Sequence, residues 1–255
     1  LGINWDSMAV MLMVLGIYFF QRQRYAYMGI ALGLGMSAKL FPILLLPIAI
    51  IYLWQEKNYK GILQSITAAG VSWLLINLPF ILFAFDGWLR FFEFSKERSI
   101  DFGSGYLALY LLADIQTPTS VANALGLISV ALAYVSVYVF RHRLDFVLSA
   151  TLVITVFVLM NKVYSPQFWL WLVPLFALTI TNKWNWMQWN LAQVLYFFSV
   201  WAYIASYNSY PYSLSRFQYA LFIIIQSIAT VTALVLTLRS ATRNQPQLAH
   251  DQIRL

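Results

Sequence analysis

The sequence predicts an all-α, polytopic transmembrane protein with about eight or nine membrane helices and an extracytoplasmic interfacial helix. Of its 255 residues, 61% are hydrophobic and 10% are charged, whereas soluble domains carry about 25% charged residues. Apolar stretches of about 20 residues, the length of a membrane-crossing helix, recur along the chain. The stretches do not alternate in period two, as the strands of a membrane barrel would.

Each expected span is an apolar run bounded by polar or basic residues. The runs are Trp5–Phe20, Ala26–Trp54, Ile62–Ala84, Val121–Phe140, Phe146–Met160, Phe168–Ile180, Leu191–Ala205 and Phe217–Leu238. The run Ala26–Trp54 is too long for one span, so we interpret it as two helices that meet near Lys39 and Pro42. We expect one transmembrane domain over residues 1–240 and a polar cytoplasmic tail over residues 241–255.

Between these runs lie two further segments of interest. The long segment Phe85–Tyr106 interleaves aromatic residues with charged ones, which is typical of a helix lying in the membrane interface. It is followed by a short apolar piece, Leu107–Leu112. The mixture of residues fits either an interfacial anchor alone or an anchor that also contributes to a site.

The distribution of Lys and Arg between the loops predicts the orientation in the membrane. With strict alternation, one side receives four basic residues: Arg90, Lys96, Arg98 and Arg216. The other receives ten: Arg22, Arg24, Lys57, Lys60, Arg141, Arg143, Lys183, Arg239, Arg243 and Arg254. The richer side is expected to be cytoplasmic, and Lys39 and Lys162 then fall at the outer membrane boundary.

This interpretation of the charge excludes several classes of function. The formal charge of +7 reflects membrane topology, so we expect no nucleic-acid partner. The absence of cysteine excludes thiol chemistry. The two histidines, His142 and His250, have no partner at ligand spacing, so we expect neither a metal site nor a cofactor.

The acidic residues are distributed in the opposite way. Six are expected outside: Asp6, Asp86, Glu93, Glu97, Asp101 and Asp114. Three are expected inside: Glu56, Asp145 and Asp251. Carboxylates contribute little to topology, so this asymmetry indicates either a polar reaction site on the outer face or an ordinary solvated loop.

The stretch NKVYSPQFWLW, residues 161–171, introduces a lysine between two apolar runs. Pro166 is suited to the first position of a helix, and Ser165 before it is suited to the N-cap. The free N–H groups of such a helix start, with Lys162 beside them, favour an anion. Lys39 and Pro42 repeat this arrangement at the same predicted depth. The alternative is that both lysines snorkel to lipid headgroups, but their shared placement favours a common phosphate.

Four stretches, in the same order, resemble a known family. INWDSMAVMLMVLGIYFF, GIALGLGMSAKLFPILLLP, SKERSIDFGSGYLALY and NKVYSPQFWLWLVP look like the polyprenol-phosphate-sugar-dependent membrane glycosyltransferases of the GT-C superfamily. The match is nearest to the bacterial branch that includes polyprenyl-phosphate-mannose-using α-mannosyltransferases. It covers about residues 3 to 180.

The resemblance implies a GT-C-like domain in the bacterial plasma membrane, with its active side extracytoplasmic. The donor would be mannose on a polyprenyl phosphate, and the acceptor a lipid, glycan or protein hydroxyl. Lys39, Lys162, Ser165 and Gln167 would bind the donor phosphate. Other residues in the matching motifs would bind substrate: Glu97, Arg98, Ser104, Asn161 and Tyr164.

The sequence departs from this family in one respect. Family members usually carry their catalytic carboxylate in the first extracytoplasmic loop, after the first span. We expect the main base to lie upstream of Leu1 and this chain alone to be inactive, with Asp6 and Asp101 as the remaining candidates. Two other functions stay open. A transporter or flippase of lipid-linked sugars is disfavoured because the chain shows no internal repeat or paired midplane ionisable groups. The other is a non-catalytic membrane subunit, which is favoured if the full gene also lacks an acid upstream.

Overall fold

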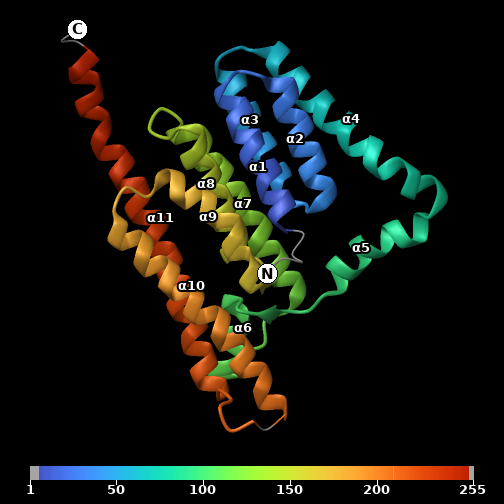
Figure 1. Cartoon of the computed structure of the whole chain (residues 1–255), viewed down its shortest axis with the longest axis vertical. Helices are drawn as coiled ribbons and strands as arrows, with labels where there is room; N and C mark the ends of the chain where they lie inside the picture. Colours follow the sequence, from blue (N-terminus) through green and yellow to red (C-terminus); the bar gives the residue numbers. More distant parts are fainter. Residues whose placement is uncertain (1–5, 209, 253–255) are drawn as a thin grey trace. The chain divides into compact units, whose positions relative to one another are not determined.

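The structure, a computed structural model, describes the backbone of residues 6–208 and 210–252 and the side chains of residues 6–206 and 210–241. The chain divides into two compact units, Leu1–Arg98 and Ser99–Leu255, and each is described by itself (Figure 1). Almost all of the described backbone is helical, and the prediction of an all-α protein is confirmed.

The described part contains eleven α-helices, three 3₁₀ segments and one pair of two-residue strands. The first unit comprises α1 (Asp6–Gln21), α2 (Tyr25–Ala38), η1 (Phe41–Leu44), α3 (Leu45–Gln55), α4 (Tyr59–Phe83) and α5 (Phe85–Glu97). The second begins with β1 (Asp101–Phe102), α6 (Gly105–Ala113), α7 (Thr119–Phe140), α8 (Phe146–Leu159) and β2 (Val163–Tyr164). It ends with η2 (Pro166–Phe168), α9 (Trp169–Thr179), α10 (Lys183–Ile204), η3 (Ala205–Asn208) and α11 (Arg216–Gln252).

Three stretches of described helix are long and apolar enough to cross a membrane: Tyr59–Phe83, Thr119–Phe140 and Arg216–Ala241. Four shorter apolar stretches accompany them: Asp6–Gln21, Phe41–Gln55, Phe146–Leu159 and Pro166–Thr179. The protein is therefore a polytopic membrane protein, as predicted from its composition. The total of eight or nine spans stays a prediction.

The expected break within Ala26–Trp54 is confirmed. Helix α2 ends at Ala38, Lys39 is extended, and the chain turns through η1 with Pro42 before α3 begins. The proline-led start before α9 is also confirmed, since Pro166 opens η2. Ser165 is the N-cap residue of η2, as predicted, with an extended backbone, although its hydroxyl makes no capping hydrogen bond. Both prolines lie at the start of a tight 3₁₀ turn, Pro42 as the second residue of η1 and Pro166 as the first of η2. Phe168 N–H donates to the Ser165 carbonyl.

The first unit is held together by close packing of α2 on α4. Gly29 and Gly33 present no side chain, and a Cβ at either position would clash with backbone or side-chain atoms of α4. Ser65 and Ala69 lie opposite them, and Ser72 Oγ donates to the Ile30 carbonyl at 3.4 Å. Small residues spaced by four let membrane helices approach closely, so this seam fixes the end of α2 where Lys39 lies.

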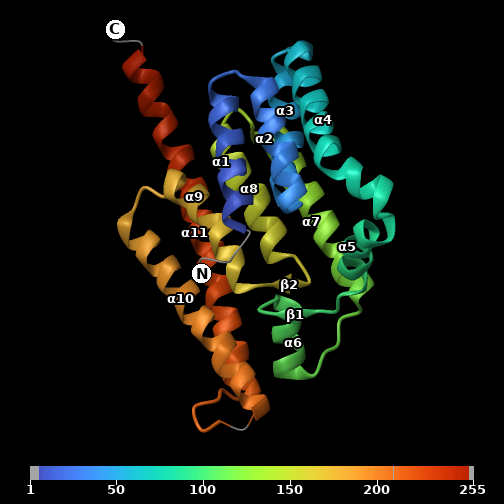
Figure 2. The same cartoon turned by 45° about the vertical axis from the view of Figure 1, so that its right-hand side comes forward.

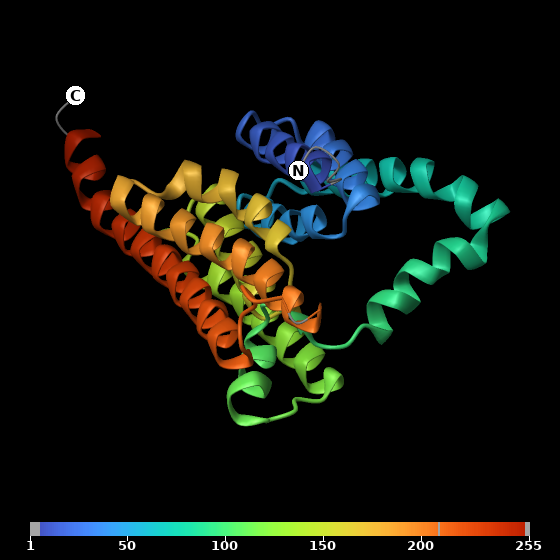
Figure 3. The same cartoon turned by 60° about the horizontal axis from the view of Figure 1, so that its bottom comes forward.

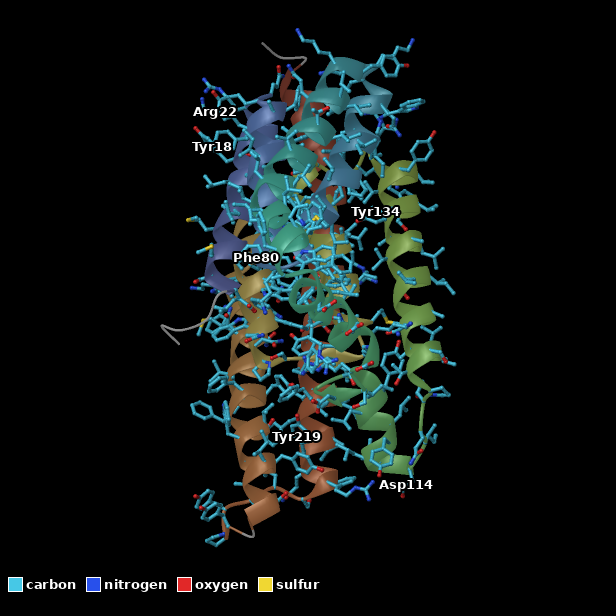
Figure 4. All side chains as sticks on the ribbon, turned by 90° about the vertical axis from the view of Figure 1, so that its right-hand side faces the viewer. Tyr18, Arg22, Phe80, Asp114, Tyr134 and Tyr219 are labelled. Carbon is cyan, nitrogen blue, oxygen red and sulfur yellow. The ribbon has the colours of Figure 1, made fainter. Side chains whose placement is uncertain are left out.

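The second unit is built on α10 and α11, which run side by side in every view (Figures 1–3). Helix α6 packs on α11, and Arg216 Nη2 lies 2.8 Å from Asp114 Oδ1 at the end of α6. Asp114 is labelled in Figure 4. Helix α10 begins at Lys183, ahead of the expected Leu191, because Asn182 Oδ1 caps it by accepting from Trp184 N–H at 2.8 Å. The hydropathy of that first part of the helix is too low to have indicated it.

Candidate functional site

Two residues predicted from the sequence, acidic Asp6 and basic Lys39, form an ion pair in the first unit. Lys39 Nζ lies 3.0 Å from Asp6 Oδ1. The Asp6 side chain is 0% exposed at the start of α1, while that of Lys39 is 34% exposed. The buried carboxylate therefore holds the ammonium in position. Because a lysine ammonium has three N–H donors, others remain able to contact an anion.

Lys39 also lines a cavity of about 410 Å³ within the first unit. The end of α2 forms one wall, and α4 and α5 form the other. Most of the lining residues are apolar, and many of them are aromatic: Met36, Ala38, Leu40, Trp73, Phe80, Ala84, Gly87, Trp88, Phe91 and Phe92. Phe80 is labelled on α4 in Figure 4. The cavity therefore places one cation, Lys39, beside a largely aromatic lining.

The polar side chains of this cavity are largely bonded to each other. Asn77 Nδ2 donates to Ser37 Oγ at 3.0 Å and to the Trp73 carbonyl at 2.9 Å. Trp88 Nε1 donates to Asn77 Oδ1 at 3.0 Å, which joins α4 to α5. Trp73 and Trp88 also meet edge to face, with ring centroids 6.3 Å apart. The walls are consequently fixed in place, and the cavity offers mainly apolar surface to an occupant.

Helix α5 confirms the helical part of the predicted interfacial segment. It has no buried residue, and its apolar and charged side chains lie on different faces. Glu97 ends the helix and is exposed, and Arg98 follows as its C-cap residue. Arg98 closes the first unit, whereas Asp101 belongs to the second.

In the second unit, the segment NKVYSPQF pairs with the segment that contains Asp101. Strands β1 and β2 are parallel, with Asp101 opposite Val163 and Phe102 opposite Tyr164 (Figure 2). Asp101 N–H donates to the Lys162 carbonyl, and Gly103 N–H donates to the Tyr164 carbonyl, both at 3.1 Å. Two motifs some 60 residues apart in the sequence are thereby brought together. Lys162 itself is only 8% exposed.

A buried network of polar side chains holds this strand pair against α10 and α11. Tyr164 Oη donates to Gln193 Oε1 at 2.9 Å, and Gln193 Nε2 donates to Thr230 Oγ1 at 2.9 Å. Tyr196 Oη donates to the Tyr164 carbonyl at 2.7 Å. Burial raises the pKa of the Tyr164 phenol, so the hydroxyl stays protonated and acts as a donor at neutral pH. The network fixes the backbone that carries Lys162.

Several of the remaining predicted residues of this unit accept hydrogen bonds from backbone N–H groups close to them in the sequence. Ser104 is buried at the N-cap of α6, where its hydroxyl accepts from Leu107 N–H at 3.2 Å. Asn161 Oδ1 accepts from Val163 N–H at 3.2 Å. Asp101 is exposed, and its Oδ1 accepts from Phe102 N–H at 2.7 Å. Ser165 and Gln167 lie half-buried at the start of η2. Direct contact of these residues with substrate stays a prediction.

The structure joins some predicted residues and leaves others separate. Asp6 and Lys39 meet in one unit, and Asp101, Asn161, Lys162 and Tyr164 meet in the other. Lys39 and Lys162 belong to different units, so their binding of one phosphate stays a prediction. In the described part of the chain, no three His, Asp or Glu side chains gather as a metal site would need.

Sequence reasoning missed the residues that support the site: Ser37, Asn77, Gln193, Gln226 and Thr230. A usable signal was present, because Asn77, Gln193 and Gln226 are strongly polar residues within apolar runs. Polar side chains at membrane depth face the protein interior and mark functional sites more often than they face lipid.

The comparisons with known proteins give one match. The model of glycosyltransferase family 87 matches residues 2–161, which is more than half of the chain. The match includes the Asp6–Lys39 pair, the aromatic cavity and the strand β1. Neither the curated proteins nor the solved structures contain a significant match.

Proposed function

The chain belongs to glycosyltransferase family 87, and we propose that it transfers mannose from a polyprenyl-phosphate donor on the extracytoplasmic face of the bacterial plasma membrane. Its family and apolar helices make it a membrane glycosyltransferase. The sugar, the lipid donor and the side of the membrane are the proposal. The acceptor is a hydroxyl group of a lipid, a glycan or a protein.

The cavity beside Lys39 is the observation that carries this proposal. A prenyl phosphate has an anionic head and an apolar, unsaturated tail. Lys39 supplies a cation, and Trp88, Phe91 and Phe92 supply an apolar aromatic wall next to it. A nucleotide sugar would instead need polar partners for its base and ribose, and the cavity's Asn77 and Ser37 are already bonded to each other. The cavity therefore supports a lipid-linked donor.

The chemistry follows from the charge that develops during transfer. The acceptor oxygen attacks the anomeric carbon, the bond from that carbon to the phosphate oxygen breaks, and the lipid phosphate leaves with the electron pair. Lys39 binds the phosphate and stabilises its growing negative charge, and Asp6 orients Lys39. We propose phosphate binding for Lys162 as well, on the basis of its sequence motif alone. The acceptor proton passes to a carboxylate, for which Asp6 and Asp101 are the candidates in the described part of the chain.

The test is donor turnover by the full-length enzyme with polyprenyl-phosphate-mannose and, separately, with GDP-mannose. Lys39→Met keeps the apolar stem and removes the charge. We expect a loss of about tenfold to hundredfold in donor affinity, since a charge-assisted hydrogen bond contributes about 1.5–3 kcal/mol. Lys39→Arg should restore part of the loss. Use of GDP-mannose as the preferred donor, or wild-type kinetics in Lys39→Met, would refute the proposal.

A matched pair on α5 tests the tail site. Phe91 and Phe94 are 49% and 60% exposed, but of the two only Phe91 lines the cavity. Phe91→Ser should raise KM for the lipid donor by about tenfold, because apolar burial is lost. Phe94→Ser should leave KM unchanged. Equal effects of both substitutions would show that the cavity does not hold the prenyl chain.

A further inference from the structure

Helices α10 and α11 enclose a groove that is separate from the candidate site. Two cavities of about 310 Å³ and 380 Å³ lie between them. Both cavities are lined by Asn185 of α10 and Leu236 of α11, so they adjoin, and the two together are called the groove. Figure 3 shows the two helices side by side along this part of their length.

The two ends of the groove differ in chemistry. One end is polar, lined with hydrogen-bonding side chains and one arginine: Thr181, Asn182, Asn185, Thr237, Arg239 and Ser240. The other end is mainly apolar, lined by Trp189, Ile225, Ile228, Ala229, Ala233 and Leu236. Arginine, amide and hydroxyl donors together suit a phosphate group, and the apolar end suits a hydrocarbon chain.

The length of the apolar end matches one leaflet of a bilayer. Ile225 and Leu236 are eleven residues apart on α11, which corresponds to about 16 Å along a helix. Half of a bilayer's hydrocarbon core is about 15 Å thick. Arg239 lies one turn beyond Leu236, near the end of the apolar stretch Arg216–Ala241. The polar end is therefore placed at headgroup depth when the helix spans a membrane.

The walls of the groove are preorganised. Trp189 is 1% exposed, its Nε1 donates to Thr230 Oγ1 at 3.3 Å, and its ring packs on Phe176 with centroids 4.7 Å apart. Opposite it, Ala229 and Ala233 leave room that a larger side chain would fill. An occupant of this groove consequently meets a wall that is already ordered, which reduces the entropy cost of binding.

We infer that this groove binds an anionic phospholipid, with its phosphate at Arg239 and one acyl chain along Ala229 and Ile225. Since the Lys and Arg pattern puts Arg239 on the cytoplasmic side, the lipid belongs to the inner leaflet. Arg239 is thirteen residues, about 20 Å, from Gln226, which lies by the strand pair. The inference therefore does not depend on the proposed function, and the lipid is distinct from the donor.

The probe is dioctanoyl phosphatidylglycerol, with zwitterionic dioctanoyl phosphatidylcholine, whose choline charge offsets its phosphate, as the comparison of zero net charge, titrated into the purified full-length protein in detergent. We expect Arg239→Gln to weaken phosphatidylglycerol binding about fivefold and to change phosphatidylcholine binding little. Ala229→Phe fills the apolar end and should weaken both lipids. Arg143→Gln, another exposed arginine on the predicted cytoplasmic side, and Val231→Phe, outside the groove on α11, are the matched controls.

Each outcome decides the inference. Selective loss of phosphatidylglycerol binding in Arg239→Gln, with unchanged controls, supports it. Unchanged phosphatidylglycerol binding in Arg239→Gln overturns it, and so does unchanged binding in Ala229→Phe. An equal loss in Arg143→Gln also overturns it, because that would indicate general surface electrostatics. If Ala229→Phe lowers the melting temperature without lipid, Arg239→Gln alone decides, since an exposed arginine can be replaced without a core change.

Discussion

Asp6 and Lys39 form an ion pair whose two ends lie in different environments, because the carboxylate is fully buried and the ammonium is about one-third exposed. Removing the lysine charge and removing the aspartate charge should therefore lower the stability by unequal amounts. Lys39→Met leaves a buried carboxylate without its cation, which costs about 3 kcal/mol or more. Asp6→Asn leaves a lysine that can extend toward water, so we expect a smaller loss.

The double variant Asp6→Asn, Lys39→Met removes both charges and therefore tests the effect of the unpaired carboxylate. It should recover most of the stability lost in Lys39→Met, because no unpaired buried charge remains. The free energy of unfolding in detergent micelles is the measurement. Equal destabilisation by the two single variants, with simple additivity in the double, would contradict the asymmetry described here.

Gly103 gives a second prediction. A Cβ at this position would meet the ring and hydroxyl of Tyr196, and the backbone cannot shift freely because Gly103 N–H is bonded to the Tyr164 carbonyl. Phe102 beside it already has a positive φ of 45°, which is costly for a bulky residue. Gly103→Ala should destabilise the protein by about 1–3 kcal/mol.

Gly105, two residues further on, is the control for this substitution. Nothing lies within 4 Å of a Cβ built there, and the residue opens helix α6. Gly105→Ala should be neutral or stabilise by up to about 1 kcal/mol, since alanine favours helix. Melting temperatures of the two variants are compared directly. A loss in Gly105→Ala as large as that in Gly103→Ala would exclude the clash with Tyr196 as the cause.

Much of this architecture was predictable because the membrane requires long apolar helices with basic residues between them. The break at Lys39 and Pro42 followed from a proline and a lysine within an overlong run, and the structure confirms it. The start of α10 at Lys183 did not follow, because its first residues are polar and aromatic and only the Asn182 cap marks it.

The site was less predictable, because its contacts join residues far apart in the sequence. Nothing near Asp101 in the sequence indicates its pairing with Val163, and only the fold brings the two strands together. The partnership of Asp6 with Lys39 likewise depends on how α1 packs against the end of α2. Sequence reasoning named the charged residues as candidates, and their roles stay a prediction, but it did not name the polar side chains that surround them.

Tyr164 and its network give a third prediction. Tyr164→Phe removes one hydroxyl and leaves buried Gln193 Oε1 without that donor, which should cost about 1–3 kcal/mol. Tyr212, which is 69% exposed, provides the matched control, and Tyr212→Phe should change stability by less than about 0.5 kcal/mol. Comparable melting temperatures for Tyr164→Phe and wild type would show that the network does not hold the strand pair in place.

The orientation of the chain gives the last prediction, and the proposed function depends on it. The loops at Arg22–Arg24, Gln55–Lys60 and Arg141–Arg143 should be cytoplasmic, and residues 85–106 should be outside. Since these 255 residues contain no cysteine, a single introduced cysteine reports its own position. Ser99 and Gln23 are both exposed. In intact cells, a membrane-impermeant thiol reagent should label Ser99→Cys and should label Gln23→Cys only after the membrane is permeabilised. Labelling of Gln23→Cys alone in intact cells would invert the orientation, and Lys39 would then face the cytoplasm, where a nucleotide-sugar donor becomes the better candidate.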